Sequence, residues 1–448
     1  MIEGLKPYAE YKNTGQDWLG ELPAHWGLRR AKYLFREIDE RSQTGKEELM
    51  SVSHLTGVTP RSQKSVTMFL AESNVGYKVC QMDDVVINTM WAWMAALGVA
   101  RQTGIVSPAY GVYHPLAVDC FLPRYADLLL RTPTYAAEYQ RRSTGVNSSR
   151  LRLYPENFLR IPLIYPPTEE QAAIVRFLDH ANRKIDLFIR SKRRLIGLLN
   201  EQKQVIINHA VTKGLDPDVP MKNSGVMRLG RVPEHWQLKR LKFICRFAYG
   251  DSLSAENRND GDVFVFGSNG IVGKHSEANT NAPCIIVGRK GSYGKVNYSY
   301  FSGFAIDTTY FIDKTQTDSE LRWLYYALQC LGLDTISQDT CIPGLSRESA
   351  YCNTLPYIKK NEQLAIASFL DRETAKLDAL IATTRDAIAL LREFRTRLIF
   401  DVVTGKLDVR DVKLPAIDEV EVLEEIDTNE ETEAEELIES EEVTDADN

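Results

Sequence analysis

The chain has 448 residues, of which 44% are hydrophobic and 26% are charged, a composition typical of soluble globular proteins of about three domains. No apolar run approaches the ~20 residues of a membrane helix, and the first residues lack the features of a signal peptide. We therefore expect a cytoplasmic protein without membrane contact. The seven cysteines are scattered and never form a CxxC pair, which predicts reduced thiols and no metal site.

The charge is distributed unevenly along the chain. From Leu414 onward there are 16 Asp or Glu and no Lys or Arg, whereas the preceding residues include 45 acidic and 54 basic side chains, a net charge of +9. A basic body is expected of a protein that binds a polyanion, although many soluble proteins without such a ligand have this charge. We expect the acidic terminus, 413–448, to be disordered. It would either screen the basic surface or serve only solubility.

Two blocks of sequence occur twice. Residues 12–35 and 222–245 share 11 of 24 positions at an offset of 210, in the pattern LGxxPxHWxxxRxK. Residues 170–189 and 362–381 share 10 of 20 positions at an offset of 192, in a pattern that begins EQ and continues with FLD. Two collinear repeats of this quality indicate an internal duplication.

The segments between the repeated blocks, about 36–155 and 246–350, match each other poorly. Both are expected to be mixed α/β, because short apolar runs alternate with turn residues. The expected strands are 85–87, 264–266, 284–287, 305–306 and 310–312. Repeated scaffolds with diverged insertions are typical of two recognition surfaces adapted to different targets.

Each copy of the second block predicts a long helix. Steps of three and four residues alternate along 178–206 and 370–398, which is a heptad seam. A helix of about 40 residues is about 60 Å long and cannot bury its apolar stripe alone, so we expect each helix to pack on the other. The expected seam residues are Leu178, Ile185, Leu195, Leu199, Leu370, Leu377, Leu380 and Leu391.

Several short motifs suggest an enzyme but are incomplete. The glycines of 267–273 are not followed by a helix-forming sequence, as a nucleotide-binding loop requires. Residues 288–295 lack the spacing of a P-loop. Residues 107–110, Ser-Pro-Ala-Tyr, lack the second proline of the amino-methyltransferase loop. We predict no catalytic residue, so a methyltransferase or nuclease acting alone is disfavoured.

The stretch 287–296 combines a strand end, three glycines, three bases and a tyrosine. Arginine and lysine can neutralise phosphate, and a bidentate arginine can read guanine; the alternative is a solvated hairpin turn. The matching region of the first half, 88–93, is more aromatic, and 141–150 is basic but equally typical of a surface turn. The candidate DNA contacts are Asn88, Trp91, Trp93, Arg141, Arg142, Asn147, Arg150, Asn269, Arg289, Lys290, Ser292, Tyr293 and Lys295.

The two repeated blocks resemble those of type I restriction–modification specificity subunits over about residues 10–410. The second copy departs from the pattern, with Lys359-Lys360-Asn361 in place of the Pro-Pro-Thr at 166–168. The resemblance implies an α/β (α+β) fold: two target-recognition domains of mixed α/β structure, joined by two long, antiparallel coiled-coil spacer helices, with an internal pseudo-two-fold duplication. The expected boundaries are 1–165 and 213–357 for the recognition domains, 166–212 and 358–412 for the helices, and 413–448 for the acidic tail.

The same resemblance implies a non-catalytic DNA sequence-specificity subunit. It would bind a bipartite double-stranded DNA target and direct adenine methylation or cleavage by partner subunits. The implied partners are two methyltransferase (modification) subunits and an ATP-dependent restriction/translocase subunit. This chain would bind no cofactor, and S-adenosylmethionine, Mg²⁺ and ATP would belong to the partners. The alternative is a coiled-coil protein-interaction scaffold without DNA readout.

Overall fold

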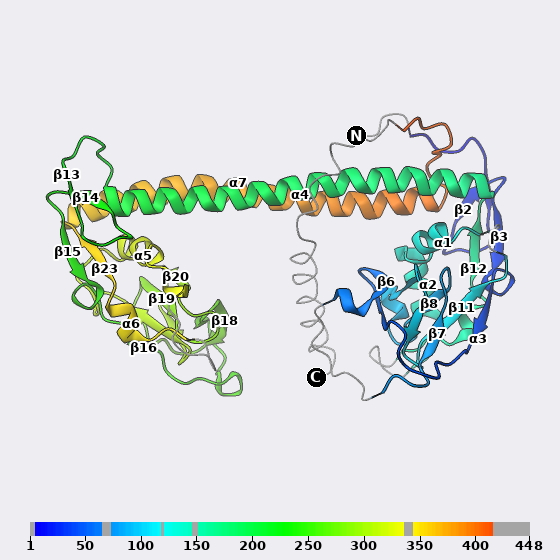
Figure 1. Cartoon of the computed structure of the whole chain (residues 1–448), viewed down its shortest axis with the longest axis horizontal. Helices are drawn as coiled ribbons and strands as arrows, with labels where there is room; N and C mark the ends of the chain where they lie inside the picture. Colours follow the sequence, from blue (N-terminus) through cyan, green and yellow to red (C-terminus); the bar gives the residue numbers. More distant parts are fainter. Residues whose placement is uncertain (1–4, 65–72, 118–120, 146–150, 336–343, 415–448) are drawn as a thin grey trace. The chain divides into compact units, whose positions relative to one another are not determined.

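The computed structural model describes residues 5–64, 73–117, 121–145, 151–335 and 344–414 (Figure 1). The chain forms two compact units. The first unit contains residues 1–189 and 388–448, and the second contains residues 190–387. The acidic terminus expected at 413–448 lies outside the described residues except for positions 413 and 414.

The first unit contains a small antiparallel sheet with additional strand pairs and short helices. Its strands are β1 (Tyr11–Asn13), β2 (Glu21–Pro23), β3 (Gly27–Arg30), β4 (Phe35–Ile38), β5 (Met50–Ser53), β6 (Gly57–Pro60), β7 (Lys78–Cys80), β8 (Val85–Ile87), β9 (Leu97–Val99), β10 (Gly104–Val106), β11 (Gly111–Pro115) and β12 (Pro162–Tyr165). Its short helices are α1 (Pro123–Leu130), α2 (Pro133–Arg142) and α3 (Pro155–Phe158). The four-stranded sheet has the order β4-β11-β8-β9, and the other strands form the antiparallel pairs β1-β2, β3-β12, β5-β6 and β7-β10.

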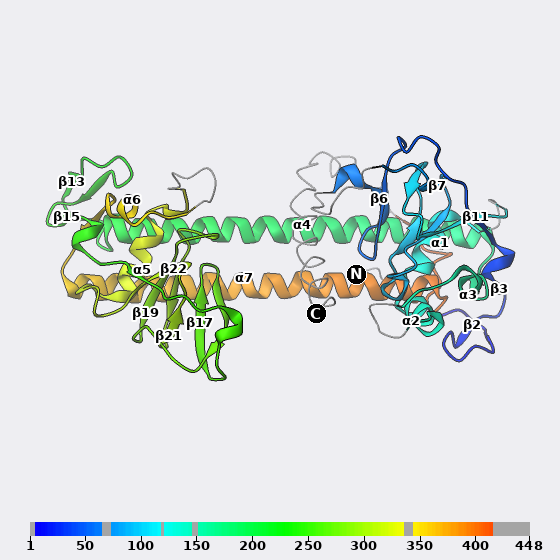
Figure 2. The same cartoon turned by 90° about the horizontal axis from the view of Figure 1, so that it is seen from below.

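The second unit has a closely similar set of elements (Figure 2). Its strands are β13 (Met221–Asn223), β14 (Arg231–Pro233), β15 (Gln237–Arg240), β16 (Ala248–Tyr249), β17 (Val263–Gly267), β18 (Gly270–His275), β19 (Cys284–Gly288), β20 (Val296–Ser299), β21 (Gly303–Ala305), β22 (Thr309–Ile312) and β23 (Thr354–Tyr357). Its short helices are α5 (Leu321–Gln329) and α6 (Arg347–Tyr351). The sheets have the orders β16-β22-β19-β20 and β18-β17-β21, with the pairs β13-β14 and β15-β23.

The four-stranded sheets of the two units have the same connectivity. β4, β11, β8 and β9 of the first unit occupy the places of β16, β22, β19 and β20 in the second. A helix follows each sheet, α1 in one unit and α5 in the other. The central strands β8 and β19 are fully buried, as expected from their apolar runs. The diverged segments therefore share a framework that their sequences do not show.

The repeated His-Trp block lies in the core of each unit, at the end of a long helix. Trp26 and Trp236 are buried. Each lies beside a glycine in the left-handed region, Gly405 with φ +78° and Gly214 with φ +80°. A Cβ atom at Gly405 would lie 2.5 Å from Pro23, so only glycine allows the chain to leave the helix so close to this block.

The long helices are α4 (Thr168–Lys213) and α7 (Lys360–Val403), which run side by side in Figures 1 and 2. They are antiparallel, because the first half of α4 pairs with the second half of α7 through Asp186 and Arg395 in the first unit. In the second unit Lys203 of α4 lies 2.7 Å from Asp378 of α7. No helix in the described ranges has both the length and the apolar character needed to cross a bilayer.

Seven of the eight expected seam residues are buried or half-buried, and Leu380 is exposed. Leu178, Ile185, Leu199 and Leu370 are buried, and Leu195, Leu377 and Leu391 are half-buried. As a residue of the helix–helix seam, Leu380 is wrong, because its side chain is 46% exposed whereas that of Ile381 is 5% exposed. Both residues are apolar, and a heptad repeat can use either one. The position of the other helix selects between them.

The contrast between the buried Ile381 and the exposed Leu380 gives a matched test of the seam. Ile381→Asp should lower the free energy of unfolding by about 3 kcal/mol, because it places a carboxylate among buried apolar side chains. Leu380→Asp should cost less than about 1 kcal/mol, because that side chain already contacts solvent. Urea unfolding of the purified variants measures both values. Equal losses would contradict the seam observed in the structure.

Candidate nucleic-acid interface

A glutamine in the first turn of each long helix holds the recognition part of its unit. The Oε1 atom of Gln171 accepts from the backbone N–H of Leu122 at 2.8 Å, and its Nε2 donates to the carbonyl five residues earlier at 2.8 Å. Gln363 makes the equivalent bonds. Its Oε1 accepts from the backbone N–H of Glu320 at 2.7 Å, and its Nε2 donates to the carbonyl of Ile358 at 3.0 Å. Both glutamines are buried, so each joins the segment before α1 or α5 to the segment before the long helix.

The glutamate before each glutamine binds the histidine of the same unit's His-Trp block. In the first unit, Glu170 Oε2 lies 2.8 Å from His25 Nε2, and Glu170 Oε1 accepts from the Tyr8 hydroxyl at 2.5 Å. Burial and the hydrogen bond to Glu170 raise the pKa of Tyr8 well above its usual value, so the hydroxyl stays protonated as a donor. The N-terminal segment is thereby tied to the start of α4.

The second unit uses its glutamate in nearly the same way. Glu362 lies 3.3 Å from His235 Nε2 and accepts from Trp236 Nε1 at 2.8 Å. The aspartates of the FLD pattern complete the set: Asp179 pairs with Arg124 of α1 at 2.9 Å, and Asp371 with Arg322 of α5 at 2.6 Å. The polar residues shared by the two copies therefore bind other parts of their own unit, which explains why they recur.

In the loop between β19 and β20, residues 289–295, Lys290 and Lys295 are exposed, whereas Arg289 is half-buried and donates to the Asp307 carbonyl at 3.0 Å. Backbone bonds anchor it on both sides, from Arg289 N to Thr308 O at 2.8 Å and from Leu345 N to Arg289 O at 2.8 Å. A Cβ atom at Gly288 would lie 2.2 Å from Ser292 O, so the tight start of the loop requires glycine. Lys290 and Ser292 are exposed.

Three further predicted residues lie beside this loop or within it. Lys295 Nζ is 2.5 Å from Asn269 Oδ1, which belongs to the β17–β18 turn, so the structure brings together two predicted contacts that are 26 residues apart. Tyr293 is half-buried and packs on the core. Its ring supports the loop instead of projecting from it.

Arg289 lies in a cluster of aromatic and basic side chains that the sequence does not reveal. Its guanidinium carbon is 5.0 Å from the ring centre of Tyr249 and 6.0 Å from that of Tyr310. The guanidinium carbon of Arg347, at the start of α6, lies 4.9 Å from the ring centre of Tyr249. Burial raises the pKa of Tyr310 to about 12, so its hydroxyl remains a donor, to Leu345 O at 3.1 Å. Arg347 and Tyr249 are additional candidate contacts.

The topologically equivalent loop of the first unit, between β8 and β9, holds the predicted residues 88–93. Trp91 and Trp93 are half-buried, and the short 3-10 turn Ala92–Met94 packs against α2. Asn88 is only 5% exposed, and its amide donates to the Tyr110 hydroxyl at 3.2 Å. Asn88 therefore supports the loop from inside, and we remove it from the candidate contacts.

The basic end of α2 lies next to this loop but is already paired with an acid. Arg141 and Arg142 both bind Glu138, at 2.7 Å and 2.5 Å. Burial of Glu138 opposes its ionisation, but the hydrogen bonds from the two arginines outweigh burial and lower its pKa. Arg141 is 65% exposed and Arg142 is 22% exposed, so Arg141 is the better placed for a ligand. Asn147 and Arg150 lie outside the described residues.

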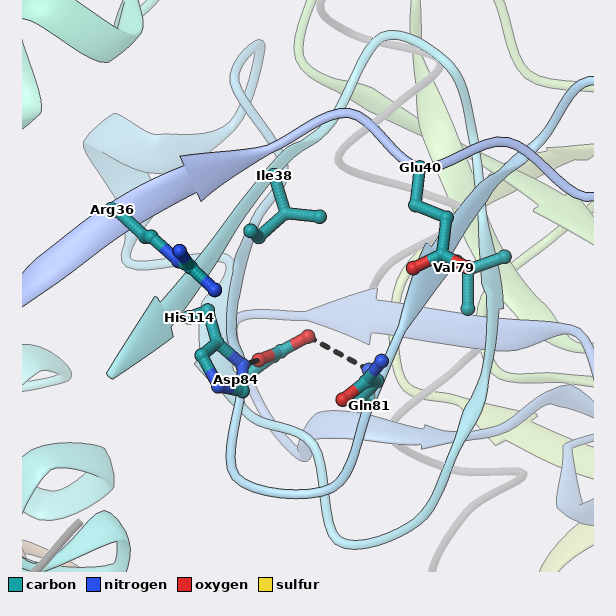
Figure 3. Close-up of a pocket in the computed structure, with 7 residues that line it drawn as sticks. All are labelled: Arg36, Ile38, Glu40, Val79, Gln81, Asp84 and His114. Atoms are coloured by element: carbon teal, nitrogen blue, oxygen red, sulfur yellow. Dashed lines mark hydrogen bonds and ion pairs between the residues drawn. The ribbon is translucent and has the colours of Figure 1, made fainter. Parts of the chain in front are cut away.

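A small cavity of about 130 Å³ in the first unit contains a His–Asp pair (Figure 3). His114 Nδ1 lies 2.7 Å from Asp84 Oδ1, and Gln81 N donates to the other oxygen of Asp84 at 2.7 Å. Arg36, Glu40 and Val79 are among the other residues that line it. In the part of the chain that the structure describes, no three His, Cys, Asp or Glu side chains gather as metal ligands.

Comparison with known proteins gives a family match within the second half of the chain. Residues 233–390 match the sequence profile of the family described as the type I restriction modification DNA specificity domain. A search of curated proteins found no match. The matched residues span β15, the two larger sheets of the second unit, the β19–β20 loop and α7 up to residue 390. Over these residues the chain is thus similar to the type I restriction modification DNA specificity domain.

Solved structures resemble the chain over most of its length. One, from work on complex assembly and conformational transition of the type I R-M system, is 16% identical, with a TM-score of 0.60 over 86% of this chain and 99% of that chain. The HsdS subunit from Thermoanaerobacter tengcongensis is 16% identical, with a TM-score of 0.45 over 88% of this chain and 99% of that chain. The first of these similarities shows that the fold is shared.

The buried glutamines give a test of how each unit is held together. Gln363→Met should lower the free energy of unfolding by about 2 kcal/mol, because it removes two hydrogen bonds and leaves Glu320 N and Ile358 O without this partner. Gln202→Met, on an exposed face of α4, should change it by less than about 0.5 kcal/mol. Thermal and urea unfolding followed by circular dichroism measure the difference. If Gln363→Met leaves the free energy of unfolding unchanged, the Gln363 side-chain amide does not stabilise the unit.

Proposed function

We propose that the whole chain is the DNA sequence-specificity subunit of a type I restriction–modification complex and has no catalytic centre of its own. The observation that carries this proposal is the family match at 233–390, which covers the sheet and the basic loop of the second unit. The first unit has the same sheet connectivity, which supports extending the assignment to it. We place the protein in the cytoplasm, where such a complex meets DNA.

The two units would arise from an internal duplication and read the two halves of a bipartite target. Supporting this, the His-Trp and EQ blocks recur in sequence, and their polar residues make equivalent bonds in both units. The loops on the shared framework differ, with Arg289 and Lys290 in one and Trp91 and Trp93 in the other. Different loops on equal frameworks would read different half-sites, and α4 and α7 would act as a pseudo-two-fold, coiled-coil spacer.

The proposed DNA contacts of the second unit are the exposed groups of the β19–β20 loop and its neighbours. Arg289 would read a base edge or bind phosphate, Lys290 and Ser292 would bind the backbone, and Lys295 with Asn269 would extend the surface. Arg347 adds a cation beside Arg289. In the first unit, Trp91, Trp93 and Arg141 are the corresponding candidates.

Partner subunits would supply the chemistry. We propose two methyltransferase subunits that hold S-adenosylmethionine and an ATP- and Mg²⁺-dependent restriction/translocase subunit. The long helices have exposed apolar side chains suited to partner helices. In the first unit these are Phe188, Leu390 and Phe394, and in the second unit they are Leu198, Val205 and Leu380.

Methylation mapping tests the proposal. Cells expressing this chain with its methyltransferase subunit should acquire modified adenines in one split, gapped motif, and cells expressing the methyltransferase alone should not. A chain in which the β19–β20 loop is replaced should alter one half of the motif and leave the other half unchanged. If an active methyltransferase produces no motif that depends on this chain, the specificity role is wrong and a coiled-coil scaffold is favoured.

The salt dependence of DNA binding tests whether Lys290 contacts the phosphate backbone. Lys290→Ala in the assembled complex should weaken binding of all DNA sequences similarly and lower the slope of log K against log salt by about one, because one phosphate contact is lost. Lys314→Ala, at an exposed position between β22 and α5, is the control and should leave the slope unchanged. Fluorescence anisotropy at several salt concentrations measures both. An unchanged slope for Lys290→Ala would remove this residue from the interface.

A further inference from the structure

The repeated His-Trp block leaves basic and aromatic side chains at the surface that neither the core nor the recognition loops use. In both copies the block ends with three basic residues and one aromatic residue, aligned at the offset of 210. The first patch comprises Arg29, Arg30, Lys32 and Tyr33, and the second patch comprises Lys239, Arg240, Lys242 and Phe243. The pattern is shared by the two halves, whereas the recognition loops are not.

The backbone presents the two patches in the same conformation. Arg30 precedes a 3-10 turn with φ −66° and ψ 143°, and Arg240 precedes the equivalent turn with φ −66° and ψ 146°. In the first patch Lys32 Nζ lies 4.9 Å from the ring centre of Tyr33, and the equivalent distance in the second patch is 4.8 Å. The two surfaces are therefore copies of one another in geometry as well as in sequence.

A cation–π contact positions the first basic residue of each patch. The Arg29 guanidinium lies 4.6 Å from the ring centre of Tyr165, and the Lys239 ammonium lies 3.4 Å from that of Tyr357. Both tyrosines end the strand that pairs with the patch strand, β12 in one unit and β23 in the other. These contacts hold the cations against an aromatic surface and leave their charge uncompensated by a carboxylate.

The patches are exposed and lack acidic partners. Tyr33 is 62% exposed and Phe243 is 68% exposed, unusually open positions for aromatic rings. Within the described ranges, none of the six basic side chains forms an ion pair with a carboxylate. In the first unit a surface hollow lies among Leu28, Arg29, Arg30 and Tyr33. Each patch thus combines unpaired positive charge with an open apolar surface.

We propose that each patch is a docking surface for an acidic region of a partner protein, with one copy of the same partner on each unit. This inference rests on the proposed function, in which that partner is the methyltransferase subunit. Two equal surfaces beside two different recognition loops fit a ligand that is the same at both units. Aromatic rings flanked by arginines are typical of protein interface hot spots, whereas phosphate contacts require cations and not rings.

The test measures how many methyltransferase subunits the full-length chain binds. The first-patch variant is Arg30→Glu with Tyr33→Ala, and the second-patch variant is Arg240→Glu with Phe243→Ala. The matched controls reverse one exposed charge outside the patches, Arg101→Glu in the first unit and Lys314→Glu in the second. Native mass spectrometry gives the stoichiometry, and titration with the methyltransferase subunit gives the affinity at each site. Binding of a duplex without the target site gives the DNA affinity of the chain alone.

The wild-type chain and both controls should bind two methyltransferase subunits. Each patch variant should weaken one of the two sites by about tenfold or more, and the variant with both patches changed should weaken both. Binding of the duplex by the chain alone should stay within about twofold. Arg30→Lys should retain assembly, because the charge remains.

Several results would overturn the inference. Full stoichiometry and affinity in the patch variants would show that the patches are not docking surfaces. Intact assembly with a uniform loss of DNA affinity would show that they bind phosphate instead. If the wild-type chain binds no methyltransferase subunit, the proposed function itself is wrong, and the docking inference is overturned with it.

Discussion

The buried glutamine in the first turn of each long helix is the interaction on which the rest of each unit depends. Gln171 joins the backbone before α1 to the backbone before α4, and Gln363 joins the backbone before α5 to the backbone before α7. A buried amide with both its oxygen and its nitrogen paired allows one geometry only, because any displacement leaves a polar group without a partner. The sheet and its loop are thereby set at a defined position on the long helix.

This arrangement separates what holds a unit together from what it presents to a ligand. The strands β8 and β19 are buried and supply the framework. The loops that follow them, β8–β9 and β19–β20, carry different side chains on equivalent supports. Loop side chains at the surface contribute little to the core. The two loops can therefore diverge in sequence while the sheets keep the same connectivity.

The long helices have apolar residues on more than one face. Ile381 is buried and its neighbour Leu380 is exposed, and the same division separates the buried Ile189 from the exposed Phe188. One stripe is used within the chain and the other remains available to partners. The basic and aromatic patches of the repeated block add a second exposed surface to each unit. Under the proposed function, DNA readout and partner binding would use different surfaces.

The sequence by itself determined the features that are local or repeated. The duplicated blocks, the long helices and the buried strands follow from identity or periodicity within a short window. The glycine-rich basic loop at 288–295 is also visible, because its glycines and cations are adjacent in the chain. Even the correspondence between this loop and 88–93 could be predicted from their positions between the repeats, although nothing in their residues matches.

Only the tertiary structure decided which of two neighbouring apolar residues is buried and which polar side chains reach solvent. Asn88 lies in the β8–β9 loop, yet its side-chain amide donates a hydrogen bond to the Tyr110 hydroxyl inside the unit. Arg347 is 58 residues from Arg289 in sequence, yet both lie against Tyr249. The physical reason is that burial and pairing depend on segments far apart in the chain. Composition and spacing within one segment do not contain that information.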